Sequence, residues 1–256
     1  MNKISNNKRT ASLLCLALLL ALTLTACTRS AAVNEEPKVA PSASLSAYLV
    51  ENDNGSLFVS SEDSGLYFVS AEKAVIKKGN KALSVSELKP GMTLQIGFDG
   101  SVCESYPAQI PNALTIEVTD ETDDKVSLYA QALKYIYENG ERADWEKTIF
   151  LDLTKLTSLS NGQKSALAYV MSNYYHTKTD ADVVRSSYEE LKAQGRLENG
   201  SLKNGVIFSV RESESKKGAF EVSQWWSPLG ALGFSGCTAK LKDGKWDISY
   251  GDAWIS

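Results

Sequence analysis

The strongest constraint on the fold is a series of short apolar runs with a period of two residues. Side chains that alternate in this way lie on the two faces of a half-buried β-strand. Asn54-Gly55 and Asp99-Gly100 interrupt the series, and both dipeptides are typical of the positive φ angles that tight hairpins require. Residues 45–118 are therefore predicted to form a small all-β barrel, with strands at 47–50, 57–59, 66–69, 92–98 and 113–118.

The apolar period changes to that of an α-helix after residue 124. Val126 and Leu133 fall on one face of the predicted helix, and Gly140 follows as a residue that ends helices. Ser160 and Gln163 have the spacing of a capping box, which predicts that a second helix begins here.

A third, shorter helix is predicted near 188–193, with Ser186 and Glu189 as its cap and Gly195 as its end. Strands prevail in the rest of the segment, and Asp243-Gly244 supplies a hairpin turn. The predicted strands are 148–153, 205–210, 219–226, 233–241, 246–248 and 253–255. Early helices and a late antiparallel meander predict an α+β domain with an antiparallel sheet over residues 125–256.

The N-terminus has the three parts of a bacterial signal peptide. Basic residues without an acidic one precede the apolar stretch 13–24, which is too short to span a bilayer. The stretch ends in Leu24-Thr25-Ala26-Cys27, which closely resembles the lipobox of bacterial lipoproteins. The resemblance implies removal of residues 1–26 and a diacylglycerol on Cys27, so that acyl chains anchor the protein to the membrane. An ordinary secretory signal with an incidental cysteine is the alternative.

Two segments are predicted to lack a packed structure. Residues 27–44 are small, polar and proline-containing, which predicts a disordered tether with an r.m.s. reach of about 20–25 Å. Residues 119–124 carry a net charge of −4 and are expected to form a solvated linker between the two domains. Calcium binding is the alternative for this acidic run, although it lacks the glycine and the ligand spacing of an EF-type loop.

Both predicted domains resemble uncharacterised families. The first resembles the YobA-like domain of Gram-positive secreted lipoproteins, through residues 88–96, Asp99-Gly100 and the run Glu104-Ser105-Tyr106-Pro107-Ala108-Gln109-Ile110. This resemblance implies an OB-type barrel and no activity. The second is similar to the C-terminal domain of other uncharacterised Gram-positive lipoproteins, through residues 227–234, 243–246 and 254–256.

Charge and residue types exclude several functions. Loss of the three basic residues of the signal peptide takes the net charge from −4 to −7, which disfavours binding of nucleic acid. His176 is the single histidine, so a zinc site would need it together with Cys103, Cys237 and a carboxylate. The Gly230-Ala-Leu-Gly233 segment lacks the helix and lysine of a phosphate-binding loop. We expect no metal and no cofactor.

The mature chain has two cysteines besides the lipid-bearing one. Export permits a disulfide between Cys103 and Cys237. They lie in different predicted domains, so a bridge would clamp the domains together. Buried free thiols are the expectation, and the bridge is the alternative.

Candidates for catalysis are few, and no residue is predicted to be catalytic. His176 lies at a predicted helix end, where histidine commonly bonds the last carbonyls. Ser213 and Lys216 have the Ser-x-x-Lys spacing, but they lie in a charged loop. Asp152 and Asp247 are the candidate pair for a carboxylate-dependent envelope hydrolase, the alternative function, which a separation above about 10 Å would remove.

Aromatic residues are the candidate ligand contacts. Trp225 and Trp226 are adjacent on a predicted strand and must point to opposite faces. An exposed ring beside the Gly230 loop would floor a ligand groove, whereas burial of both rings is the alternative. Tyr106, in the YobA-like run, is the third candidate.

The function expected from these features is that of a non-catalytic surface lipoprotein. It faces outside the cytoplasm, is held by its lipid anchor, and binds an envelope protein, peptide or glycan. A role as accessory to a membrane transporter or sensor is a further hypothesis. Thr28 is not the aspartate that retains lipoproteins at the inner membrane of two-membrane bacteria, which favours the outer leaflet of a single cytoplasmic membrane.

Overall fold

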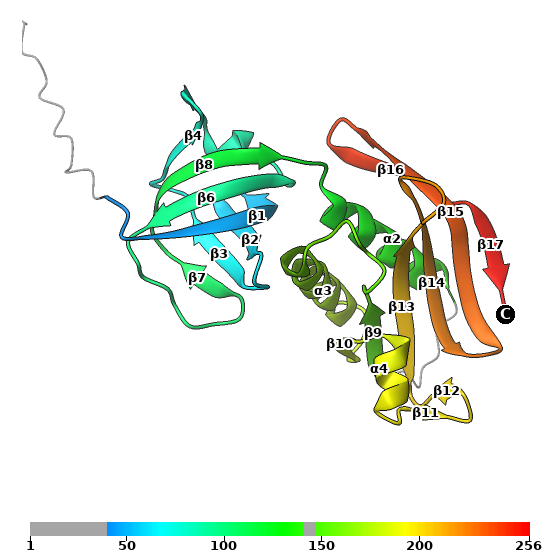
Figure 1. The fold of residues 1–256 in the computed structure, drawn as a ribbon. Helices are drawn as coiled ribbons and strands as arrows, with labels where there is room; N and C mark the ends of the chain where they lie inside the picture. The colour runs from blue at the N-terminus through cyan, green and yellow to red at the C-terminus, as the bar shows by residue number, and fades with distance from the viewer. Residues whose placement is uncertain (1–39, 141–146) are drawn as a thin grey trace, which may run out of the picture. The chain divides into compact units, whose positions relative to one another are not determined.

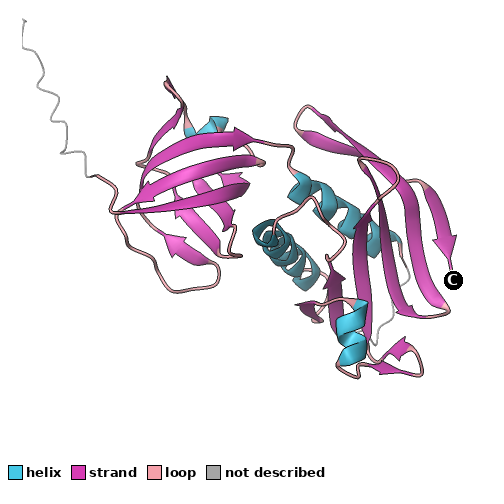
Figure 2. Cartoon of the chain, viewed as in Figure 1, coloured by secondary structure: helices cyan, strands magenta, loops and turns pink. Residues whose placement is uncertain are grey.

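The computed structural model describes residues 40–140 and 147–256. The expected signal peptide, Cys27 and most of the expected tether lie outside these residues. Within them the chain is mostly β-structure, with antiparallel pairs prevailing, as Figure 2 shows. Two long helices, α2 (Lys125–Asn139) and α3 (Asn161–His176), accompany the two large sheets. None of the described helices is both long and apolar enough to cross a bilayer.

The first sheet contains the strands that the alternating pattern predicts. Its order is β5-β4-β8-β6-β1-β2-β3-β7 (Figure 1). The bounds are β1 Ala43–Asp53, β2 Ser56–Ser61, β3 Leu66–Ser70, β4 Val75–Lys78, β5 Lys81–Ala82, β6 Met92–Phe98, β7 Ala108–Ile110 and β8 Ala113–Glu121, with a 3₁₀ turn, η1, at Val85–Glu87. Strands β4, β5 and β7 were not predicted, because two to four residues are too few for a visible alternation.

The first sheet curls into a half-barrel around its own apolar core. Strand β1 pairs antiparallel with both β2 and β6, and β6 pairs antiparallel with β8. Strand β7 pairs parallel with β3 and precedes β8 directly. The inward side chains are fully buried, among them Leu49, Leu57, Leu94, Ile96 and Ile116.

Two predicted boundaries of this region differ from the structure. Strand β1 begins at Ala43 because Ala43 and Ser44 pair with the end of β6, so the expected tether stops before Ala43. The acidic segment 119–124 is not a linker throughout, because β8 continues to Glu121 beside Met92. Charged side chains suit this exposed strand end, where Glu121 pairs with Lys78 at 2.9 Å.

The second sheet has the order β10-β9-β13-β14-β15-β16, and β17 also pairs with β15. The bounds are β9 Thr148–Asp152, β10 Asp182–Arg185, β13 Gly205–Glu212, β14 Ala219–Ser227, β15 Gly230–Lys242, β16 Lys245–Ser249 and β17 Asp252–Ile255. The expected antiparallel meander is confirmed from β13 to β16. Strands β10 and β13 instead run parallel to β9, because α3 returns the chain to the same end of the sheet before β10 begins and the connection 186–204 does so again before β13.

The capping residues determine where the helices begin. The predicted box at α3 is confirmed, since Gln163 N donates to the Ser160 hydroxyl at 3.2 Å and Ser160 N donates to the Gln163 amide at 2.8 Å. Helix α4 (Tyr188–Ala193) covers the predicted residues, but its capping box is formed by Ser187 and Glu190, each one residue after the predicted pair. The expected cap Ser186 directly follows β10, and its N–H donates to Leu151 O of β9 at 3.2 Å. Behind α4 lies the small pair β11 (Leu197–Glu198) and β12 (Ser201–Leu202).

Helices α2 and α3 bury apolar side chains against both sheets. One core cluster contains Tyr48 and Phe58 from the outer face of the first sheet, Leu133 from α2, Met171 from α3 and Phe208 from the second sheet. The described residues between Ala40 and Ser256 accordingly belong to one compact unit by their contacts.

Helix α3 approaches the first sheet most closely at Gly162. A Cβ atom on this buried residue would lie 1.8 Å from the carbonyl oxygen of Ser61. Backbone therefore packs directly on backbone, and glycine is required for this approach rather than for an unusual φ angle.

Gly162→Ala is expected to destabilise the protein by about 3 kcal/mol, the upper end of the range for overpacking, because α3 must move away from β2. The measurement is chemical unfolding followed by circular dichroism. Asn161→Ala, an exposed change on the same turn, is the control and should change stability by less than about 0.5 kcal/mol. Equal stability of the two variants would contradict the proposed close contact.

Candidate functional site

The two tryptophans that the sequence singled out are packed on opposite faces of the second sheet. The Trp225 ring meets Tyr188 of α4 edge-on, with 5.1 Å between ring centroids. Trp226 packs against the main core and lies over Gly230, where a Cβ atom would be 2.3 Å from the indole. Both rings are half-buried, so neither presents an open platform.

Tyr106, the third candidate, lies on the surface. Its side chain is 76% exposed. Its ring meets Tyr169 of α3 edge-on at 6.0 Å, and Tyr169 in turn lies 6.5 Å from Phe68 of β3. Tyr106, Tyr169 and Phe68 together form a partly exposed aromatic surface, which we call the aromatic ridge.

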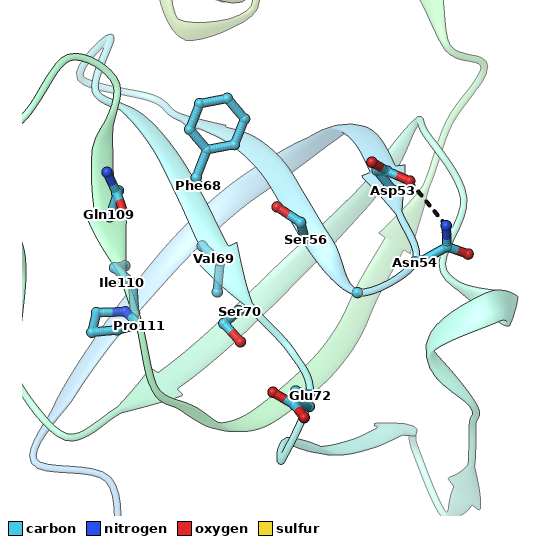
Figure 3. A pocket seen from close by; sticks show the side chains of 11 residues that line it. Asp53, Asn54, Ser56, Phe68, Val69, Ser70, Glu72, Gln109, Ile110 and Pro111 are labelled. Atoms are coloured by element: carbon cyan, nitrogen blue, oxygen red, sulfur yellow. Dashed lines mark hydrogen bonds between the residues drawn. The ribbon is translucent and has the colours of Figure 1, made fainter.

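The aromatic ridge borders a hollow between the β1–β2 turn and strands β3 and β7, which we call the β3–β7 groove. Figure 3 shows its lining, in which Phe68 and Gln109 extend from neighbouring strands. The groove has a volume of about 320 Å³, which lies within the range of small-ligand sites. Its lining side chains are Asp53, Asn54, Ser56, Phe68, Val69, Ser70, Glu72, Gln109, Ile110 and Pro111.

The charge of the β3–β7 groove is negative. Asp53 and Glu72 are its ionisable lining residues, and no lysine or arginine lines it. Asn54 Nδ2 donates to Asp53 at 3.0 Å and Gln109 Nε2 donates to Ser105 Oγ at 3.3 Å, whereas the hydroxyl groups of Ser56 and Ser70 line the groove and face a ligand there. A neutral or positively charged ligand suits this lining, and an anion does not.

A larger hollow of about 470 Å³ lies between β1 and α2. Its most buried polar group, Asp124, is satisfied by the protein, because it accepts bonds from Tyr48 Oη at 3.2 Å and Ser127 N at 3.1 Å. Burial raises the pKa of Asp124 above its usual value, against the opposing effect of these hydrogen bonds. Burial and the neighbouring Asp124 likewise raise the pKa of Tyr48. Asp124 therefore has a structural role, because its hydrogen bonds link β1 to the start of α2.

The two carboxylates considered for hydrolysis lie on distant strands. Asp152 ends β9 and Asp247 is in β16, four strand positions away in the sheet. At about 4.8 Å per strand the sheet separates them by on the order of 19 Å, beyond the spacing of glycosidase carboxylates. Asp152 instead accepts hydrogen bonds from Thr154, from N at 3.0 Å and from Oγ1 at 2.5 Å.

The cysteines and the histidine are also apart from one another. Cys103 and Cys237 are both free, so no bridge joins them. Cys237 is buried as expected, but Cys103 is exposed because it lies in the surface loop that pairs with Gln109. His176 is exposed at the end of α3. In residues 40–140 and 147–256 no three His, Cys, Asp or Glu side chains are grouped to hold a metal ion.

Comparison of the chain with family models, with curated proteins and with solved structures finds no match. The geometry of the described residues is therefore the basis for any functional proposal.

One carboxylate binds several donors from separate elements. Glu212, at the end of β13, accepts hydrogen bonds from Tyr129 Oη of α2 at 2.5 Å, Thr157 Oγ1 at 2.8 Å and both the N–H and the hydroxyl of Ser158. Partial burial acts to raise its pKa, but the bonds from Ser158, Tyr129 and Thr157 prevail and lower it to about 2. Glu212 thus connects the sheet, α2 and the loop before α3.

Glu212→Gln is expected to reduce the acid sensitivity of folding. Because the folded-state pKa is lowered, the carboxylate stabilises the protein fully above its ordinary pKa, and this stabilisation is lost as the pH falls toward 2. The difference in unfolding free energy between pH 6 and pH 2.5 should be smaller in the variant by about 1–2 kcal/mol, after allowance for solvent screening. Urea unfolding measures it.

The matched control for this measurement is Glu214→Gln, two residues further along and exposed. It should keep the pH dependence of the unmodified protein. An unchanged pH dependence in Glu212→Gln would show that the bonds to Glu212 contribute no stability.

Proposed function

We propose that this chain is a membrane-anchored extracytoplasmic lipoprotein whose β-rich unit binds an envelope component in the β3–β7 groove. The lipobox-like ending at Cys27 supports the anchor, and the signal-peptide pattern before it supports export. The exposed ring of Tyr106 on the aromatic ridge, whose Phe68 lines the groove, is the observation that carries the binding role.

The strand pairing supports an OB-type, YobA-like barrel over residues 43–121. If β7 and β8, separated by Pro111 and Asn112, count as one interrupted strand, the sheet has five principal strands. In chain order these are β1, β2, β3, β6 and the combined β7–β8 strand. Strand β1 pairs with β2 and β6, and the combined strand pairs with β3 and β6. Such barrels bind oligomeric ligands on the face of their second and third strands, which here adjoins the groove. Residues 125–256 would be the accompanying α+β domain.

The lining suggests which part of an envelope polymer is bound. Aromatic side chains contribute large contact areas at low entropic cost and stack on sugar rings or apolar side chains. Asp53 and Glu72 disfavour anionic polymers and favour a neutral glycan segment or a positively charged peptide segment. Exposed Tyr106 extends the contact beyond the groove.

Tyr106→Ala is expected to weaken binding of the full-length protein to an isolated envelope fraction about tenfold, because it removes an exposed aromatic contact. Its stability should change by less than about 0.5 kcal/mol, since the ring is mostly exposed. Co-sedimentation with the envelope fraction measures affinity, and thermal unfolding measures stability. Tyr106→Phe, which keeps the ring, should bind normally.

Trp226→Ala serves as the contrasting variant, because it should lower stability while a folded fraction retains affinity. Binding of Tyr106→Ala at full strength, or absence of binding by the unmodified protein to any envelope fraction, would refute the proposed site.

Cys27→Ser is expected to move the exported protein from the detergent-rich to the aqueous phase in a detergent partition experiment, because the acylated thiol is its anchor. Cys15→Ser, in the apolar stretch of the signal peptide, is the matched control and should leave partition unchanged. Retention of the Cys27→Ser protein in the detergent phase would contradict lipid attachment at Cys27.

A further inference from the structure

A second, separate cavity lies where the first sheet meets the start of α3. It has a volume of about 150 Å³, and strands β1, β2 and β6 form one wall while α3 forms the other. We call it the α3 N-terminal cavity. The polar lining residues that matter here are Ser46, Ser60, Glu62, Thr93, Ser160 and Gln163.

Ser60 is the most unusual residue of this cavity. It is 2% exposed, and its hydroxyl has no hydrogen-bond partner among the residues that the structure describes. In the sheet, Tyr48 is paired with Ser60 on one side and with Thr93 on the other, so the three side chains share the outer face of the first sheet. A buried hydroxyl without a partner is unfavourable, and a bound water, ion or ligand is one way in which native structures supply the missing bond.

The start of α3 contributes the polar side chains of Ser160 and Gln163 to the lining. The first N–H groups of a helix have no acceptor within it, and the cap Ser160 satisfies that of Gln163. Gly162 holds this end of α3 against Ser61, next to Ser60. A helix of 16 residues also carries a partial positive charge at its N-terminus, which disfavours a bound cation.

The charges of the lining residues favour a neutral ligand. No lysine, arginine or histidine lines the cavity, and Glu62 at its border repels anions. Hydroxyl and amide groups both donate and accept hydrogen bonds, so the lining suits a ligand with several hydroxyl groups. The volume is about half the lower limit for drug-sized ligands, which leaves room for one ring rather than a chain.

We propose that the α3 N-terminal cavity binds a single hydroxyl-rich neutral ring, the sugar unit of a glycan, and that Ser60 donates a hydrogen bond to it. This site is distinct from the β3–β7 groove and does not depend on ligand binding there.

The test is thermal unfolding and titration calorimetry of the full-length protein with D-glucose and N-acetyl-D-glucosamine. The unmodified protein should bind one of them with heat and with a rise in unfolding temperature that glycerol at equal concentration does not produce. Ser60→Ala should bind about tenfold more weakly, as expected for one lost hydrogen bond. Without ligand, the same variant should unfold at an equal or higher temperature, because it removes an unpaired buried hydroxyl.

Two comparisons complete the experiment. Ser46→Ala removes an exposed hydroxyl of the same lining and should weaken sugar binding less than Ser60→Ala does. The loss of sugar affinity caused by Ser60→Ala should be equally large in a Tyr106→Ala background, which separates this site from the β3–β7 groove. The proposal is overturned if neither sugar binds, if sodium phosphate or ammonium stabilises the protein instead, or if Ser60→Ala binds sugar normally.

Discussion

The side chain and the backbone of Asp124 join three parts of the chain at one point. Its carboxylate caps α2 by accepting the N–H of Ser127 and also accepts the hydroxyl of Tyr48 from β1. Its carbonyl oxygen accepts the indole N–H of Trp246, from β16 of the second sheet, at 2.7 Å. Since the bonds to Tyr48 and Trp246 link residues more than 70 positions apart in sequence, the orientation of α2 is fixed relative to both sheets. The rest of the packing requires this orientation, because α2 contributes to the shared core on both sides.

The packing also explains why a description as two domains on a linker is incomplete. In β1 and β2 the side chains of Leu49 and Leu57 fill the half-barrel, whereas Tyr48 and Phe58 point outward into the core shared with the helices. The half-barrel therefore buries both faces of these strands, and separating it from α2 and α3 would expose its outer apolar face to water. Acidic residues at 119–124 do not loosen the connection, since β8 runs on to Glu121 and Asp124 begins the helix.

The sequence predicted those elements whose pattern is local and lost those that depend on distant partners. Asn54-Gly55 and Asp243-Gly244 have positive φ angles at both positions, as the hairpin turns require, and the Ser160 capping box is decided within four residues. Strand β10 has one half-buried side chain and becomes a strand because β9 lies beside it.

The residues of the candidate site likewise divide into those that a local pattern predicts and those that it does not. Tyr106 was found from its own surroundings, but the aromatic ridge also needs Phe68 and Tyr169, whose approach across 101 positions of sequence no local pattern encodes. Trp225 and Trp226 are residue types that often contact ligands, but the Trp225 ring packs against α4 and the Trp226 ring packs against Gly230.

The two surfaces proposed for ligands both depend on the position of α3. Both include residues of α3, which lines the cavity through Ser160 and Gln163 and completes the aromatic ridge through Tyr169. These points are separated by about 9–14 Å along the helix axis at 1.5 Å per residue. Their positions relative to the first sheet are set by the contact between Gly162 and Ser61, where no side chain can intervene. A shift of α3 away from β2 would enlarge the cavity and also move Tyr169 relative to Phe68 and Tyr106. The same backbone contact that stabilises the fold therefore holds both candidate binding surfaces in shape, and a substitution there should impair binding at each site as well as stability.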